Sequence, residues 1–145
     1  MNCEKCKKLC MLMESRVNEF LLLLRLTVGV VFVQAGWGKF MNFDRTVAFF
    51  SKIGIPFTEL SVVLAAGTEL VGGLLLIVGL GTRLITLPMA FVMIVAILTA
   101  HIGDIGGIVD LVSLKAWIYL VLFLLLSATG AGKWSLDARC CKDDG

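Results

Sequence analysis

The sequence predicts an all-α polytopic membrane protein, a four-transmembrane-helix bundle with a short interfacial helix between spans one and two. Three observations support this fold class. The chain has 145 residues, of which 59% are hydrophobic and 17% charged, and its 15 glycines come in addition. Soluble domains contain about 45–50% apolar residues with glycine included, so the excess must face lipid. The mean hydropathy is +0.96, and the apolar residues form four long runs separated by short polar intervals.

The same composition excludes several other classes of protein. Disordered chains, collagens, coiled coils and secreted disulfide scaffolds do not have this apolar content. The formal net charge of +2 is too weak for a nucleic-acid footprint. Four spans of about 20 residues use roughly 80 residues. The prediction is therefore an N-terminal tail (residues 1–19), one membrane domain (20–132) and a C-terminal tail (133–145).

The first span is predicted at residues 20–40, which are apolar except for Arg25, Gln34 and Lys39. This run is too long for the apolar region of a cleaved signal peptide, and no small-residue cleavage site follows it. Residues 41–58 are more polar and contain the turn-like sequence Gly54-Ile55-Pro56. Apolar residues at 47–50 and at 53 predict a short amphipathic helix that lies at the membrane interface.

Spans two and three are predicted at residues 59–80 and 84–102, with Glu69 inside span two and His101 at the far end of span three. The tight turn between them requires the two helices to run antiparallel. The fourth span, at residues 114–131, ends in the sequence Gly130-Ala131-Gly132. The stretch after it contains polar groups that we expect to cap a short helix or to form a structural clamp with the turn after span two: Arg83, Ser135 and Asp137.

The distribution of lysine and arginine predicts the orientation of the chain, because cytoplasmic loops and tails carry an excess of them. One side of the predicted bundle carries eight of these residues: Lys5, Lys7, Lys8, Arg16, Arg83, Lys133, Arg139 and Lys142. The opposite side carries four: Lys39, Arg45, Lys52 and Lys115. We therefore expect a multi-pass protein of the cell inner membrane with both termini in the cytoplasm.

Helical spacing places the charged residues of the spans on glycine-lined faces. In span one, Arg25, Gly29, Phe32, Gly36 and Lys39 step by four, three, four and three residues, so they form one stripe. In span two, a second stripe consists of Ala65, Glu69, Gly72, Leu76 and Gly79, with Gly73 beside it. Small residues let helices approach closely in lipid, so these stripes predict helix packing with Arg25 and Glu69 facing each other.

Two interpretations of these polar residues remain open. A charge within a span costs about 2.5–3.5 kcal/mol on insertion scales, so each charge needs a partner. In the structural interpretation, an Arg25–Glu69 pair fixes the helix register, Lys39 extends to the outer surface and His101 is solvated. In the functional interpretation, a polar pocket of the bundle binds a lipid-soluble ligand such as a quinone, and its candidate residues are Arg25, Gln34, Lys39, Glu69 and His101.

Several motifs together resemble the DoxX family of small four-helix membrane proteins over about residues 25–138. They are Arg25 with Gly29, Gly36 and Lys39; the segment at 54–56; Glu69-Leu70-Val71-Gly72-Gly73 and Gly79-Leu80-Gly81-Thr82-Arg83; and the segment at 130–137. The resemblance implies the four-helix fold and a link to membrane redox chemistry, because related DoxD proteins form part of a thiosulfate:quinone oxidoreductase. It carries over Arg25, Lys39, Glu69, Arg83 and Asp137 without assigning a catalytic role to any of them.

Five cysteines lie in the two tails, outside the family pattern. Cys3, Cys6 and Cys10 have the spacing C-x2-C-x3-C and share one face if residues 3–10 are helical, whereas Cys140 and Cys141 are adjacent. A reducing cytoplasm argues against structural disulfides. The remaining interpretations are free or reversibly oxidised thiols, a zinc or iron–sulfur site, and palmitoylation.

The residues leave three functions open. The first is a quinone-linked or redox-associated membrane subunit that serves a redox enzyme partner. The second is a non-catalytic scaffold or assembly partner for an oxidoreductase complex, and the third is a small-solute transporter, which would need a homo-oligomer to form a pathway. The sequence contains no nucleotide-binding loop, zinc-protease motif or nucleophile elbow, so nothing in it indicates hydrolase or ATPase chemistry.

Overall fold

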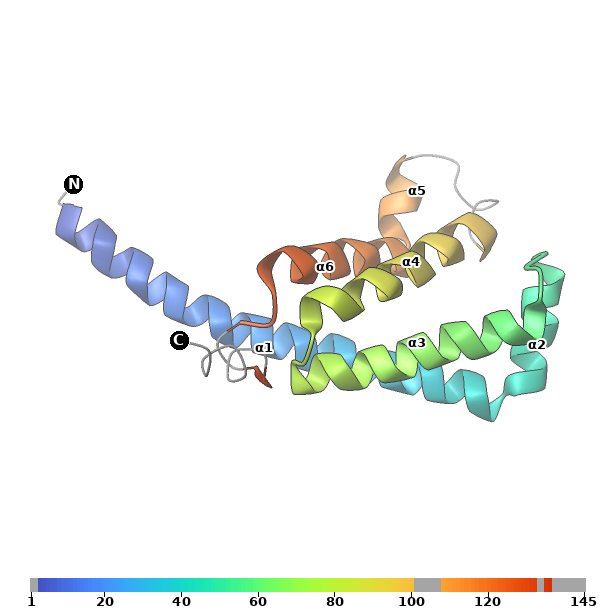
Figure 1. Ribbon diagram of the computed structural model, residues 1–145. Coiled ribbons are helices and arrows are strands. Elements are labelled where there is room, and N and C mark those ends of the chain that lie inside the picture. Colours follow the sequence, from blue (N-terminus) through green and yellow to red (C-terminus); the bar gives the residue numbers. More distant parts are fainter. Residues whose placement is uncertain (1–2, 101–107, 133–134, 137–145) are drawn as a thin grey trace.

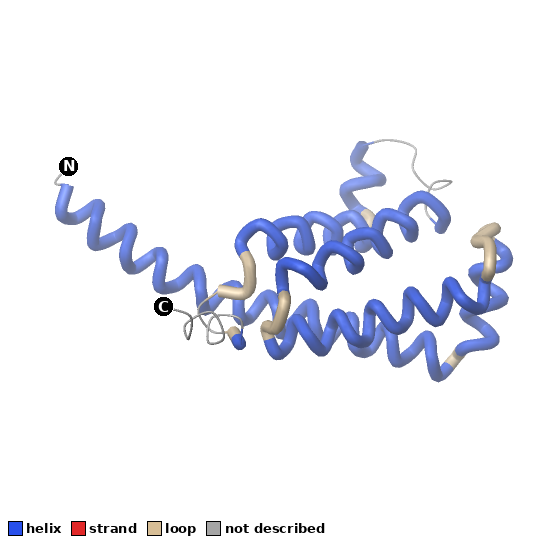
Figure 2. Tube along the Cα trace, in the orientation of Figure 1, coloured by secondary structure: helices blue, strands red, loops and turns tan. Residues whose placement is uncertain are grey.

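A computed structural model describes residues 3–100, 108–132 and 135–136, and this part of the chain is helical apart from short links (Figures 1 and 2). The elements are α1 (Cys3–Met41), α2 (Phe43–Lys52), α3 (Thr58–Val78), α4 (Thr82–Ala100), α5 (Ile108–Ser113) and α6 (Lys115–Thr129). The helices α1, α3, α4 and α6 lie along the long axis of the molecule, and α2 and α5 lie across it (Figure 1).

The long helices form two antiparallel pairs, α1 with α3 and α4 with α6, and α3 also packs on α4. The link between the pairs is the predicted tight turn. It begins at Gly79, which adopts a left-handed conformation (φ 75°) and donates its N–H to the carbonyl of Leu75. Glycine is the usual residue at this position because it has no Cβ to clash. The turn therefore returns the chain at once into α4.

Among the described residues, three helical segments are long and apolar enough to cross a membrane. They are Arg16–Met41, Thr58–Val78 and Thr82–Thr99, in agreement with the first three predicted spans. The fourth, α6, is apolar but has only 15 residues, whereas a span needs about 20. The structure thus shows an all-helical protein with three candidate spans, and the fourth span stays a prediction.

The first helix begins earlier than we predicted. Residues 1–19 were expected to be a tail because they lack a long apolar run, but α1 is continuous from Cys3. This segment contains no glycine or proline, and extending an existing helix needs no new nucleation step. Its charged residues therefore lie on a helix that projects beyond the bundle (Figure 1).

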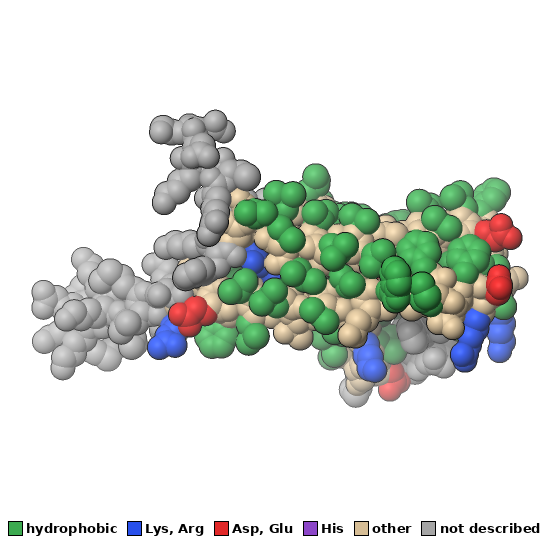
Figure 3. All heavy atoms as spheres, turned by 90° about the horizontal axis from the view of Figure 1, so that it is seen from below, with side chains coloured by type: hydrophobic (Ala, Val, Ile, Leu, Met, Phe, Trp, Pro, Cys, Tyr) green, Lys and Arg blue, Asp and Glu red, His purple; other side chains and the backbone are tan. Residues whose placement is uncertain are grey.

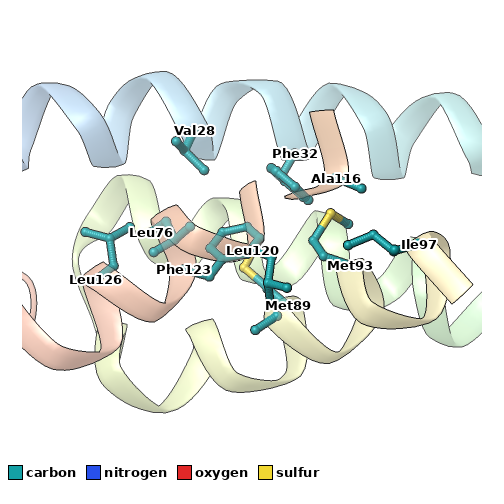
Figure 4. Packing of buried hydrophobic residues seen from close by; sticks show 11 residues of the cluster. Val28, Phe32, Leu76, Met89, Met93, Ile97, Ala116, Leu120, Phe123 and Leu126 are labelled. Carbon is teal, nitrogen blue, oxygen red and sulfur yellow. The ribbon is translucent and has the colours of Figure 1, made fainter. Parts of the chain in front are cut away.

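The core is formed by all four long helices (Figure 4). Phe32 of α1 lies edge-to-face against Tyr119 and Phe123 of α6, with ring centroids 5.0 Å apart in both pairs. Leu76 of α3 and Met89 of α4 are fully buried in the same cluster. This contact across the bundle joins the two helix pairs.

The glycine stripes form the contact between α1 and α3, as the sequence predicted. A Cβ atom added at Gly29 would lie 2.8 Å from the Gly73 carbonyl oxygen, and one added at Gly36 would lie 2.7 Å from the Ala66 carbonyl oxygen. Only glycine allows two backbones to come this close. The outer faces of the helices are hydrophobic instead, as Figure 3 shows for one side of the molecule.

Candidate functional site

A charged pair joins α1 and α3 near the end of the bundle where α2 lies, here called the Lys39 end. The ammonium Nζ of Lys39 donates a hydrogen bond to Oε2 of Glu69 at 2.5 Å. The Glu69 side chain is 6% exposed and the Lys39 side chain 26%. Gly36 lies one turn before Lys39. It packs against α3 at Ala66 and Leu70, which flank Glu69 in the sequence. The close helix approach therefore brings the two charges together.

The predicted contact between Arg25 and Glu69 is wrong, and the helix register explains why. Gly29 faces Gly73 and Gly36 faces Ala66, so Glu69 is level with residue 33 of α1. At 1.5 Å per residue, Arg25 is then about 12 Å away along the axis and Lys39 about 9 Å. Glu69 pairs instead with Lys39. The structural interpretation expected the Lys39 side chain to extend to the outer surface, but its ammonium group binds Glu69.

Arg25 lies at the opposite end of the bundle, here called the Arg25 end. Its side chain is fully buried, and Nη1 donates to the Ala131 carbonyl oxygen at 2.6 Å. The guanidinium also lies against Gly79 of the α3–α4 turn, where an added Cβ would meet both Arg25 and Ser135 within 3 Å. Arg25 thus joins α1, the α3–α4 turn and the segment after α6.

The clamp that we predicted from Arg83, Ser135 and Asp137 stays a prediction, and in the described residues it is Arg25 that bonds to the segment after α6. Ser135 is buried beside Arg25, and its hydroxyl donates to the Gly132 carbonyl oxygen at 2.7 Å. Arg83 is exposed and lies against Gly130, and Asp137 is outside the described residues. The sequence did contain a signal for Arg25, since a charge inside a span must find a polar partner. It did not contain the identity of that partner, a backbone carbonyl 106 positions away.

Two other predicted pocket residues do not join the pair. Gln34 is exposed, because it lies two positions from both Phe32 and Gly36 and so faces away from the buried stripe of α1. His101 lies outside the described residues. Of the five candidate ligand-binding residues, the structure brings Lys39 and Glu69 together.

A hollow of about 490 Å³ lies between the end of α3 and the first turns of α4, at the Arg25 end of the bundle. Its lining is apolar and consists of Leu75, Leu80, Gly81, Leu84, Ile85, Leu87 and Pro88. Such a surface fits hydrocarbon and offers no polar side chain to orient a ligand. The charged pair and the hollow are therefore separate features.

The five cysteines predicted as metal ligands have no described side chains, so the metal site stays a prediction. Among the side chains that the structure describes, no group of three His, Cys, Asp or Glu residues is close enough to hold a metal ion. Cys3, Cys6 and Cys10 belong to the helical backbone of α1, and their side chains lie outside the description, as do Cys140 and Cys141 altogether.

Three long apolar helices and an ion pair enclosed between two of them define a polytopic membrane protein. The family model for DoxX matches residues 20–102. The chain belongs to the DoxX family, which confirms the resemblance seen in the sequence.

Relatives among known proteins cover most of the chain. It is 32% identical over 126 residues to "Inner membrane protein YphA" of Escherichia coli strain K12, which covers 82% of this chain and 89% of YphA. It is 30% identical over 116 residues to "Inner membrane protein YqjF" of the same organism, covering 80% of this chain and 88% of YqjF. Over 81 residues, 56% of this chain and 59% of the relative, it is 40% identical to "Putative oxidoreductase CatD" of Bacillus subtilis strain 168. No solved structure matches the chain significantly.

Proposed function

We propose that the protein is a quinone-linked or redox-associated membrane subunit that binds a lipid-soluble ligand at Lys39 and Glu69. The observation that carries this proposal is an ion pair within candidate spans, where each charge costs about 2.5–3.5 kcal/mol on insertion scales. An intramembrane carboxylate that is kept despite this cost is a functional candidate by default. The name of one relative, "Putative oxidoreductase CatD", supports the redox assignment.

The two side chains differ in a way that suits a quinone. Glu69 is enclosed, but about a quarter of the Lys39 side chain remains accessible. A quinone carbonyl oxygen that approaches from the lipid would accept a hydrogen bond from the Lys39 ammonium. Glu69 would stay within reach as a group that accepts or releases a proton.

The proposal includes the topology that the sequence predicts, with four spans, both termini in the cytoplasm and α2 at the outer interface. Phe43, Val47 and Phe50 of α2 are half-buried, whereas Arg45 and Lys52 are exposed. The helix lies across the ends of α1 and α3 (Figure 1). This amphipathic arrangement is typical of a helix in the plane of the membrane surface.

The direct test is mass spectrometry of organic extracts from gently purified wild-type protein, Glu69→Gln and the control Glu59→Gln. Glu59 is exposed in the first turn of α3, so the control makes the same substitution on the same helix. We expect a quinone in stoichiometric amount from wild type and Glu59→Gln, and none from folded Glu69→Gln. Equal quinone in all three proteins would place the ligand elsewhere.

A non-catalytic scaffold for an oxidoreductase complex is the second candidate function. The observation that favours it is that Lys39 and Glu69 bond directly to each other across the α1–α3 contact, as a structural cross-link would. In that case a partner enzyme should co-purify with the full chain, and the extracts of wild-type protein should contain no stoichiometric small molecule.

A further inference from the structure

An amide side chain lies on the face of α1 that points away from the bundle. Gln34 is exposed, and so are Val30 and Trp37 one turn before and after it. Among the described residues, the Gln34 amide has no hydrogen-bond partner. In a membrane this face meets hydrocarbon, where an amide without a partner is costly. The side chain of Gln34 therefore needs a polar partner from outside the chain.

The register between α1 and α3 places Gln34 at the middle of the membrane. Gly29 faces Gly73, so Gln34, five residues beyond Gly29, is level with Thr68, five residues before Gly73. Thr68 is the midpoint of α3, which extends over Thr58–Val78. The middle of a bilayer is about 15 Å from either edge of its hydrocarbon layer, and a glutamine side chain is too short to reach water or headgroups from there.

The exposed residues on this face of α1 have the spacing of a coiled-coil seam. They step by four and three residues along the helix and are here called the outer stripe: Leu23, Thr27, Val30, Gln34, Trp37 and Met41. Two parallel helices that supercoil keep residues with this spacing in contact along their whole length. A polar residue at one such position, as Gln34 is here, fixes the register of the two helices.

A second copy of the chain is the partner that meets the Gln34 amide at the right depth. Copies with the same lysine and arginine distribution insert in the same orientation, so their α1 helices are parallel. A two-fold axis along the membrane normal then places both Gln34 side chains at one level. Each amide has N–H donors and a C=O acceptor, so the two amides satisfy each other. An acyl chain of a lipid offers neither group.

We propose that the outer stripe of α1 is the interface of a parallel homodimer, in which the Gln34 side chains of the two copies hydrogen-bond to each other. Lys39 is five residues beyond Gln34, which is about 140° around the helix. The interface therefore leaves the Lys39–Glu69 pair of each copy uncovered. The dimer does not depend on the ligand proposed for that pair.

The first test is disulfide cross-linking in native membrane vesicles, with the native cysteines replaced by serine. Thr27→Cys and Val30→Cys lie on the outer stripe and keep Gln34, so mild oxidation should convert them to covalent dimers. The matched control is Phe91→Cys on α4. Phe91 is exposed, and the contact between Gly72 and Met89 places it within about two residues of the depth of Gln34. It should stay monomeric.

Two results of this experiment would overturn the interface. One is the absence of covalent dimer from both variants of the outer stripe. The other is equal cross-linking of Phe91→Cys, which would show that the chains collide at random in the membrane.

The second test asks whether the Gln34 amide drives the association. Full chains with donor or acceptor fluorophores are reconstituted in phosphatidylcholine vesicles and diluted with lipid. Gln34→Leu should need roughly tenfold more protein per lipid than wild type for half-maximal energy transfer, as expected for the loss of hydrogen bonds between helices in a membrane. Phe91→Leu is the control and should behave like wild type. Unchanged association of Gln34→Leu would contradict the role of the amide.

Discussion

At the scale of single residues, Lys39 and Arg25 have different kinds of partner. Lys39 meets a carboxylate, Glu69, whereas Arg25 donates to a backbone carbonyl of the segment after α6. The sequence identified all three residues because charges inside apolar runs are conspicuous. It assigned Glu69 to the wrong cation because depth in a span depends on the register between helices, and in this bundle glycine contacts set that register.

The Lys39–Glu69 pair predicts a specific pattern of stability. Lys39→Met should lower the free energy of unfolding by about 3–5 kcal/mol, because it leaves an enclosed carboxylate without its partner. The double variant Lys39→Met/Glu69→Leu should recover most of that loss, since apolar residues replace both charges. Thermal unfolding in detergent measures both effects. Additive losses in the double variant would show that the two residues do not interact.

Arg25 predicts a different effect, confined to the Arg25 end. Arg25→Met should remove the bond to Ala131, which is worth about 1.5–3 kcal/mol for a charged donor, and release the segment after α6. Limited trypsin digestion should then cut at Lys133 faster than in wild type. The control is Arg16→Met, because the Arg16 side chain is exposed and paired with Glu19. Equal rates of cleavage in the two variants would contradict the role of Arg25 in holding the segment after α6.

At the scale of the elements, long apolar runs predicted the helices of the first three spans, and small-residue spacing predicted the contact between α1 and α3. The stripes with Gly29 and Gly73 do face each other, because a face without side chains is the one that lets backbones approach. The helical start of α1 was missed because its residues lack the apolar period, although they contain no helix breaker. Gln34 faces away from the contact between α1 and α3 because its angle on α1 differs from that of the glycine stripe.

The glycine contact can be tested within a single helix. Gly73→Ala should destabilise the protein by about 1–3 kcal/mol, because the new methyl group would collide with backbone atoms of α1. Gly67→Ala should be neutral or slightly stabilising, since a Cβ at Gly67 meets no atom within 4 Å and alanine is the better helix former. Thermal unfolding of the two variants side by side decides the matter. Similar losses in both would contradict the packing described.

At the scale of the whole molecule, composition and family membership establish a membrane protein, and the count of spans decides its topology. An even number of spans places both termini on one side. This agrees with the contact of Gly132 with Asn18 and Leu21, which brings the start of the C-terminal tail to α1. The lysine and arginine distribution predicts that both termini are cytoplasmic, and this orientation stays a prediction.

The topology predicts which positions a membrane-impermeant maleimide reaches in intact cells. In a background without native cysteines, Ser51→Cys on the exposed face of α2 should be labelled directly. The comparison at the Arg25 end uses Arg16→Cys, because Arg16 is exposed whereas Asn18 is half-buried. Arg16→Cys should be labelled only after the cells are permeabilised. Labelling of both positions in intact cells would contradict four spans with cytoplasmic termini.

The central claim is that Lys39 and Glu69 serve a ligand and do not merely join two helices. The variant Lys39→Met/Glu69→Leu separates these roles, because it should keep the fold while it removes every polar group of the pair. The decisive measurement is the binding of a short-chain quinone to this variant and to wild type, both purified and shown to be folded. The account predicts saturable binding of one quinone per wild-type chain and its loss in the variant. Equal affinity in the two proteins would contradict it.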